Sequence, residues 1–136
     1  MEDVTDFITD TVALARYLED SLPDAASAAF GQAERGEGSI LVPQIVVGEF
    51  IYVAMKGRLK VADPKSSIKL VLEELRGASF IFQSVFPEEA WDNFLSLEVP
   101  ELHDRLIAAE AQYRNIPLIS NDPAFHGIPN LKTIWK

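Results

Sequence analysis

Hydrophobic and polar positions along the chain follow two patterns. Short runs rich in β-branched and aromatic residues predict strands at residues 4–9, 39–42, 78–85, 116–120 and 131–135. Runs with apolar residues every three or four positions predict helices at residues 11–20, 24–34, 43–57, 63–76, 87–97 and 101–115. Strands that alternate with helices indicate an α/β sandwich built on a mainly parallel sheet.

The helix predicted at residues 43–57 carries an isolated acid. Glu49 is the only charged residue between Leu41 and Lys56. A helix that is apolar most of the way round is expected to be buried, and no Lys or Arg lies one turn from Glu49. An uncompensated carboxylate in a dry core costs several kcal/mol. Glu49 is therefore expected either on a narrow polar stripe or beside a wet cleft, a hydrogen-bonding group or a metal.

Three other acids stand at the ends of predicted elements, and each has an ordinary structural explanation. Asp10, with Thr11, follows the first strand and suits a helix N-cap. Asp104 lies in a first helical turn, where the helix dipole favours negative charge. Asp122 precedes Pro123 in a sequence typical of an Asx turn.

The helix predicted at residues 101–115 has one apolar face and two possible ion pairs. Asp104 shares its face with Ile107, Ala108 and Ala111, so this face is expected to turn inward. Acid and base spaced four residues apart predict two solvent-exposed pairs, Glu101–Arg105 and Glu110–Arg114.

The four acids gain meaning when they are considered together. Ligands collect at the carboxyl ends of parallel strands, so Asp10, Glu49, Asp104 and Asp122 are expected to converge on one edge of the sheet. Clustered carboxylates raise each other's pKa unless a cation lies among them, and Mg²⁺ and Mn²⁺ prefer such oxygen ligands. This chemistry suits phosphodiester hydrolysis, because the metal activates a bound water and offsets charge in the transition state.

Composition narrows the possibilities further. The 136 residues fit one domain, residues 1–136, and no cysteine is present for a disulfide or a thiolate metal site. No long apolar run and no basic leader region occur, so a cytoplasmic protein without a membrane segment is expected. A net charge of −9 argues against holding nucleic acid by bulk electrostatics. Half of the Lys and Arg nevertheless lie between Lys56 and Arg76, either as a basic strip or as an ordinary solvated surface.

Over nearly its whole length the sequence resembles PIN domains, in particular the VapC-type ribonuclease toxins of VapBC toxin–antitoxin pairs. The resemblance is carried by Asp10-Thr11 after the first strand and by three segments, ILVPQIVVGEF with Glu49, HDRLIAAEA with Asp104 and LISNDPAF with Asp122. It implies a three-layer fold with a five-stranded parallel sheet between helices, Mg²⁺- or Mn²⁺-dependent endonuclease activity on RNA, homodimerisation and inhibition by an antitoxin protein.

The same resemblance implies roles for individual residues. Asp10, Glu49, Asp104 and Asp122 match the four acidic positions, as catalytic residues and metal ligands. Thr11 stands where a hydroxyl residue lies near the scissile phosphate, and Asn121 is expected to help position metal or water. Independently of the resemblance, the basic strip from Lys56 to Lys69, which includes Arg58, is expected to guide the RNA backbone because of its charge.

One residue departs from the family pattern, and the two histidines have no role in it. Val12 occupies a position where the family commonly has a small polar residue, which concerns the fine geometry around Asp10. His103 and His126 are expected to have surface or capping roles, because the chain has no cysteine or nearby histidine for a zinc site.

Other functions are compatible with parts of the pattern. A haloacid-dehalogenase-like phosphatase needs a second Asp where Val12 stands, and a receiver domain expects paired acids and a lysine after the last strand. A catalytically inactive PIN-like scaffold that binds RNA or protein remains the non-enzymatic alternative, although four intact acids argue against it.

Overall fold

The computed structural model of the chain describes residues 5–57 and 64–136 and, in the second range, side chains from residue 68 onward. Five strands form one sheet in the order β3-β2-β1-β4-β5. All four neighbouring pairs are parallel. The strand bounds are β1 Thr5–Thr9, β2 Gly38–Pro43, β3 Ile81–Ser84, β4 Leu118–Ile119 and β5 Thr133–Ile134. The predicted parallel α/β sheet is confirmed.

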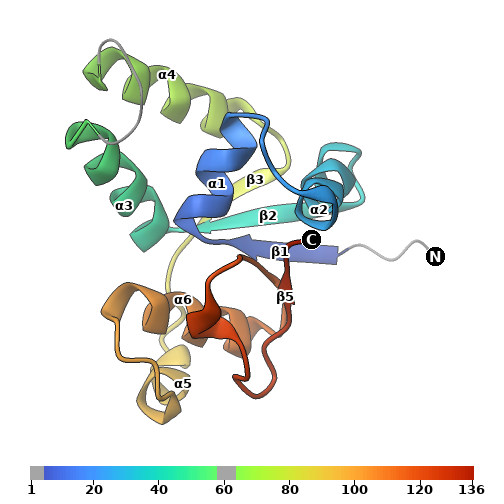
Figure 1. Cartoon of the computed structure of the whole chain (residues 1–136), viewed down its shortest axis with the longest axis vertical. Coiled ribbons are helices and arrows are strands. Elements are labelled where there is room, and N and C mark those ends of the chain that lie inside the picture. The colour runs from blue at the N-terminus through green and yellow to red at the C-terminus, as the bar shows by residue number, and fades with distance from the viewer. Residues whose placement is uncertain (1–4, 58–63) are drawn as a thin grey trace.

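Helices cover both faces of this sheet and complete three layers. Figure 1 shows α1 to α4 on one face and α5 and α6 on the other. The bounds are α1 Thr11–Leu18, α2 Asp24–Glu34, α3 Gln44–Met55, α4 Pro64–Gly77, α5 Ala90–Ser96 and α6 Leu102–Arg114, with a short 3-10 helix η1 at Pro123–Phe125. In the described ranges, none of these helices combines the length and the apolar character needed to cross a bilayer.

Several elements are shorter than their patterns predict. The strand predicted at residues 78–85 pairs only at Ile81–Ser84, and its carboxyl end lies opposite Pro43, where the parallel partner β2 also ends. The helix predicted at residues 87–97 begins at Ala90, after a turn in which the Ala90 amide donates to the Pro87 carbonyl at 3.0 Å. Pro43 ends β2 and is the N-cap of α3, not a residue of its first turn.

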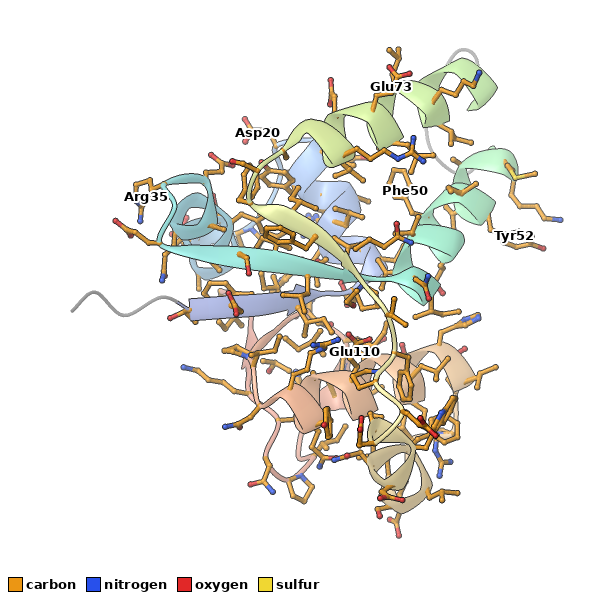
Figure 2. All side chains as sticks on the ribbon, turned by 180° about the vertical axis from the view of Figure 1, so that it is seen from behind. Asp20, Arg35, Phe50, Tyr52, Glu73 and Glu110 are labelled. Carbon is orange, nitrogen blue, oxygen red and sulfur yellow. The ribbon has the colours of Figure 1, made fainter. Side chains whose placement is uncertain are left out.

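The expectation that α3 is buried on all sides is wrong. Only Val46, Phe50 and Ala54 on this helix are buried, whereas Tyr52 is 58% and Met55 65% exposed. Figure 2 shows Phe50 inside the molecule and Tyr52 at its edge. One face of α3 packs on the molecule and the other carries apolar residues into solvent, so apolar composition alone overstated the burial of this helix.

The strand order determines where the site forms. β1 pairs with β2 on one side and with β4 on the other, and the helices that follow β1 and precede β4 lie on opposite faces of the sheet. The carboxyl ends of β1 and β4 are adjacent at this switch point, where the Asp10 amide donates to the Ile119 carbonyl at 3.3 Å. Such a point is the usual ligand site of an open parallel sheet.

Candidate active site

Asp10 joins the ends of two neighbouring strands. Its Oδ1 accepts from the Ala13 amide at 2.8 Å and so caps α1, and its Oδ2 accepts from the Ser120 hydroxyl. Ser120 in turn accepts from the Asp122 amide at 3.0 Å. Burial raises the pKa of Asp10, and the hydrogen bonds from Ser120 and Ala13 oppose this rise. The negative charges of Asp122 and Glu49 raise the pKa further, so three acids act on one another here.

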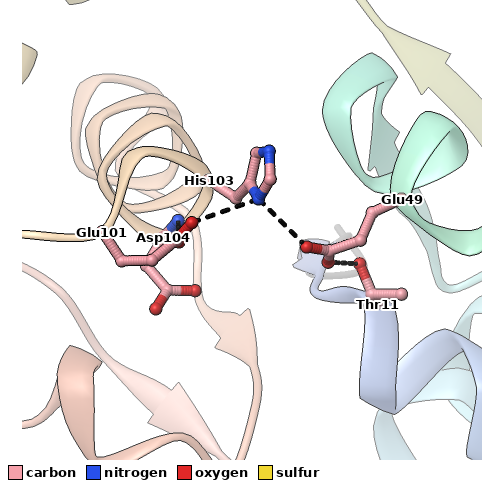
Figure 3. A network of polar contacts seen from close by, with 5 residues as sticks. All are labelled: Thr11, Glu49, Glu101, His103 and Asp104. Carbon is pink, nitrogen blue, oxygen red and sulfur yellow. Dashed lines mark hydrogen bonds and ion pairs between the residues drawn. The ribbon is translucent and has the colours of Figure 1, made fainter. Parts of the chain in front are cut away.

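Glu49 reaches the same region from α3. Thr11 donates a hydrogen bond to its Oε1, and His103 Nδ1 lies 3.2 Å from its Oε2 (Figure 3). The Glu49 side chain is 32% exposed, so it faces solvent in part and not a dry core. Its compensation comes from a hydroxyl and an imidazole on two other helices.

Asp104 lies in the first turn of α6, which Glu101 caps by accepting from the Asp104 amide at 2.7 Å. Burial raises the pKa of Asp104 to about 6. The negative charges of neighbouring acids act in the same direction, namely those of Asp122, Glu101, Glu49 and Asp10. Acids from four separate elements therefore form one electrostatic cluster, here called the acid cluster: Asp10, Glu49, Asp104 and Asp122.

Asp122 completes the acid cluster from the turn after β4. Its Oδ1 accepts from the Ala124 amide at 2.9 Å and caps η1, as the predicted turn requires. The neighbouring Asn121 is exposed.

Lys56, one of the two expected substrate-binding cations, is not joined to the acid cluster. Lys56 caps the far end of α3, and its Nζ lies 5.1 Å from the centre of the Tyr52 ring. Glu49 is seven residues earlier, about 10 Å along the helix axis. Arg58 lies outside the described residues.

Two predictions for α6 need correction. Arg105 does not pair with Glu101; its guanidinium donates to the Phe94 carbonyl at 2.7 Å and lies over the Phe94 ring. The pair of Glu110 and Arg114 forms at 2.8 Å, but it is not solvent-exposed, because only 2% of the Glu110 side chain is accessible. A spacing of four residues correctly predicts that acid and base lie on the same side of α6. Whether they pair, and whether the pair is exposed, depends on how α5 and β3 pack against this helix.

The donor chemistry of the acid cluster fits a hard divalent cation. All four side chains offer carboxylate oxygens, and their mutual repulsion gives a cation something to relieve. Within residues 5–57 and 64–136, however, no three such side chains converge closely enough to form a finished metal site. Hydrogen bonds hold Asp10 toward Ser120 and Glu49 toward Thr11 and His103, so joint coordination requires a change of side-chain conformation.

Sequence reasoning missed two participants. His103, which was assigned to a surface or capping role, bridges Glu49 and Glu101, with its Nδ1 3.1 Å from Glu101. Ser120, predicted only as the last residue of a strand, is buried and donates a hydrogen bond to Asp10. The available signal was position: His103 precedes Asp104 directly, and Ser120 ends the strand before Asp122.

Comparison with known proteins finds relatives of this fold. A family model described as PIN domain matches residues 7–131. The structure of VapBC2 from Rickettsia felis, bound to a DNA fragment from its promoter, is similar with a TM-score of 0.73 and 19% identity over 95% of this chain and 97% of that chain. The structure of FitAB bound to an IR36 DNA fragment has a TM-score of 0.66 and 14% sequence identity, over 93% of this chain and 92% of that chain. A toxin–antitoxin complex from Klebsiella pneumoniae has a TM-score of 0.58 and 19% sequence identity, over 91% of this chain and 93% of that chain. No curated protein matches the sequence.

Proposed function

Because the chain belongs to the PIN-domain family, we propose that it is a nuclease that uses Mg²⁺ or Mn²⁺ to cleave single-stranded RNA internally. The observation that carries the proposal is the acid cluster, in which burial and the negative charges of neighbouring acids raise the pKa of Asp10 and of Asp104. Members of this family among toxins are generally nucleases, and the four acids match the family's acidic positions.

Each acid has a role in this proposal. Asp10, Asp104 and Asp122 would hold the cation, and Glu49 would serve as a further ligand or orient the water. A divalent cation bound there supplies a water of lowered pKa and neutralises charge on the phosphodiester. Thr11 holds Glu49 and Ser120 holds Asp10 by hydrogen bonds, and both acid side chains would turn from these partners to share the cation.

Membership of the PIN-domain family also suggests which proteins the chain binds. We propose that the chain is the VapC-type toxin of a toxin–antitoxin pair, acts in the cytoplasm as a homodimer and is inhibited by a cognate antitoxin. The similar structures include toxin–antitoxin complexes, two of them bound to DNA, and this supports an antitoxin partner. A PIN-like scaffold that binds RNA without cutting is the alternative, favoured by the incomplete convergence of the acids.

Cleavage of a fluorescent single-stranded RNA tests the proposal. The wild-type protein is expected to cut with Mn²⁺ and to stop when EDTA is added. Asp10→Asn is expected to reduce the rate by on the order of 100-fold or more, because it removes a charged metal ligand at constant size.

The matched control is Asp24→Asn, which removes an exposed acid at the start of α2, away from the acid cluster. It should cleave like the wild type. Equal cleavage by wild type and Asp10→Asn, after a mock purification excludes contaminating nuclease, would reject the proposal. RNA binding without cleavage by the wild type would favour the scaffold.

A further inference from the structure

A second concave site lies beside the acid cluster. A cavity of about 390 Å³ opens at the carboxyl ends of β2 and β3. Its walls come from the start of α3, the loop after β3, α5 and α6, and include Gln44, Ile45, Phe86, Trp91, Leu106 and Glu110. Neither the metal nor the acids of the proposed reaction need this cavity, which we call the aromatic cavity.

The aromatic cavity continues directly from the acid cluster along two helices. On α3, Ile45 lies one turn before Glu49, and on α6, Leu106 lies one turn after His103. Glu49 and His103 touch each other across these two helices at 3.2 Å. One helical turn is about 5.4 Å, so a group in the aromatic cavity lies about one nucleotide away from the acids.

The floor of the aromatic cavity contains a buried carboxylate with one free oxygen. Glu110 Oε2 accepts from the Ser84 hydroxyl at 2.6 Å and from Arg114 Nε at 2.8 Å, whereas Oε1 has no partner among the described residues. Every fully buried side-chain oxygen or nitrogen in those residues does have a partner. Oε1 is therefore not fully buried, and Glu110 is one of the residues that line the aromatic cavity.

Another part of the cavity lining is aromatic. The rings of Phe86 and Trp91 lie 4.4 Å apart between centroids, and Trp91 remains 47% exposed. Phe94 supports Trp91 from the side in an edge contact at 5.3 Å. A large apolar ring is thus held in a fixed place with much of its surface uncovered, as in sites that stack planar groups.

We propose that the aromatic cavity binds an unpaired nucleobase that carries an exocyclic amino group, next to the phosphodiester that is cut. This rests on the proposed function, because it places the base of an RNA substrate beside the acid cluster. The base stacks on Trp91 and donates from its amino group to Glu110 Oε1. Uracil has no amino group and is the poorest ligand.

The charge of the protein makes such a site useful. A chain with a net charge of −9 gains little from the phosphate backbone, and stacking of a base on an aromatic ring does not depend on charge. Arg114 already neutralises Glu110, so the carboxylate accepts a hydrogen bond without repelling a nearby phosphate strongly.

Binding of labelled five-nucleotide RNAs in EDTA, measured by fluorescence anisotropy, tests this inference without requiring cleavage. Oligo(A) and oligo(C) are expected to bind about tenfold more tightly than oligo(U). Glu110→Gln replaces the free oxygen by an amide NH₂ while an oxygen still faces Arg114, so the preference should reverse toward oligo(U). Trp91→Leu should weaken binding of all three by about tenfold, because it removes the stacking surface.

The tryptophan emission locates the bound base. The chain has two tryptophans, so in Trp135→Phe only Trp91 reports. Its emission should change with oligo(A) and oligo(C) at the concentrations that saturate anisotropy. Unchanged emission, equal affinity for the three RNAs, or unaltered affinity in Trp91→Leu would overturn the inference. So would an emission change that follows protein concentration alone, since a second copy would then fill the cavity.

Failure of this site and failure of the nuclease proposal give different results. Mn²⁺-dependent cleavage without any base preference retains the nuclease and rejects the nucleobase site. Base-selective binding through Trp91 and Glu110 without cleavage supports the nucleobase site and rejects the nuclease. Trp91→Leu keeps the inference testable if Glu110→Gln does not fold, because Trp91 is half exposed.

Discussion

Helix α6 carries two acidic regions with opposite environments. Glu110, in its middle, is buried and is paired with Arg114 and Ser84. Asp104, at its start, has four other acids nearby, and burial and these charges raise its pKa to about 6. Among the described residues, His103 is the basic side chain that contacts the acid cluster, through Glu49.

This difference separates an acid that supports the fold from acids that oppose it. The folded protein loses stability when a buried carboxylate loses either its cationic partner or its hydroxyl donor. Carboxylates that raise each other's pKa destabilise the folded state at neutral pH, because the charged forms repel. Acids of the second kind indicate a binding site when a ligand of opposite charge is available.

The largest effect should follow removal of the structural acid. Glu110→Ala is expected to lower the free energy of unfolding by about 3 kcal/mol, because it leaves Arg114 and Ser84 without their acceptor and opens a void. Urea denaturation measures the change. Glu110→Gln, which keeps the shape and one acceptor, should lose less; if Glu110→Ala unfolds at the wild-type urea concentration, the distinction between the two regions is wrong.

The matching substitution in the acid cluster should have the opposite sign. Asp104→Asn is expected to raise the unfolding temperature of the metal-free protein at pH 7 by a few degrees, because the neutral amide no longer repels the other acids. Thermal unfolding in EDTA provides the measurement, and a lower unfolding temperature for the variant would contradict the expectation.

The difference in stability between Asp104→Asn and the wild type should depend on pH. The folded pKa of Asp104, about 6, lies above its usual value of 3.8. The stability that protonated Asp104 contributes is therefore fully present below pH 3.8 and is lost as pH rises through 6. The gain from Asp104→Asn should shrink as pH falls from 7 and should disappear near pH 4. A gain that is constant over this range would show that repulsion is not its cause.

The smallest effect is expected at His103, which contacts Glu49 of the acid cluster. His103→Ala removes the imidazole that bridges Glu49 and Glu101, but both contacts are partly exposed, so stability should change by about 0.5 kcal/mol or less. RNA cleavage should fall by no more than about tenfold, since Thr11 still holds Glu49. A loss as large as that of Asp10→Asn would mean that His103 acts directly in the reaction.

Much of the fold follows from local pattern. The alternation of strands and helices predicted the parallel sheet, and the predicted bounds of α2, residues 24–34, agree with the structure. The predicted strands at β3, β4 and β5 were too long. The carboxyl ends of β3 and β4 lie opposite the last residues of β2 and β1, and β5 pairs only with the two residues of β4, so strand length depends on pairing, which is not a local property.

The site was partly accessible to the same reasoning. The rule that ligands gather at carboxyl ends of parallel strands predicted that Asp10 and Asp122 lie close together, and their shared contact with Ser120 agrees with it. The partners of individual side chains were not predictable: Arg105 turns to the carbonyls near Phe94, and His103 turns to Glu49, because α5 and α3 approach α6 only in the folded chain.

Thermal unfolding at pH 7 with increasing Mn²⁺ tests most directly whether the acid cluster binds a divalent cation. The wild-type protein and Glu110→Gln should gain stability with a saturable dependence on Mn²⁺, while Asp10→Asn should gain much less, because a ligand that binds the folded state raises its stability through the residues that hold it. Equal stabilisation of Asp10→Asn and the wild type, or none in the wild type, would contradict the central claim.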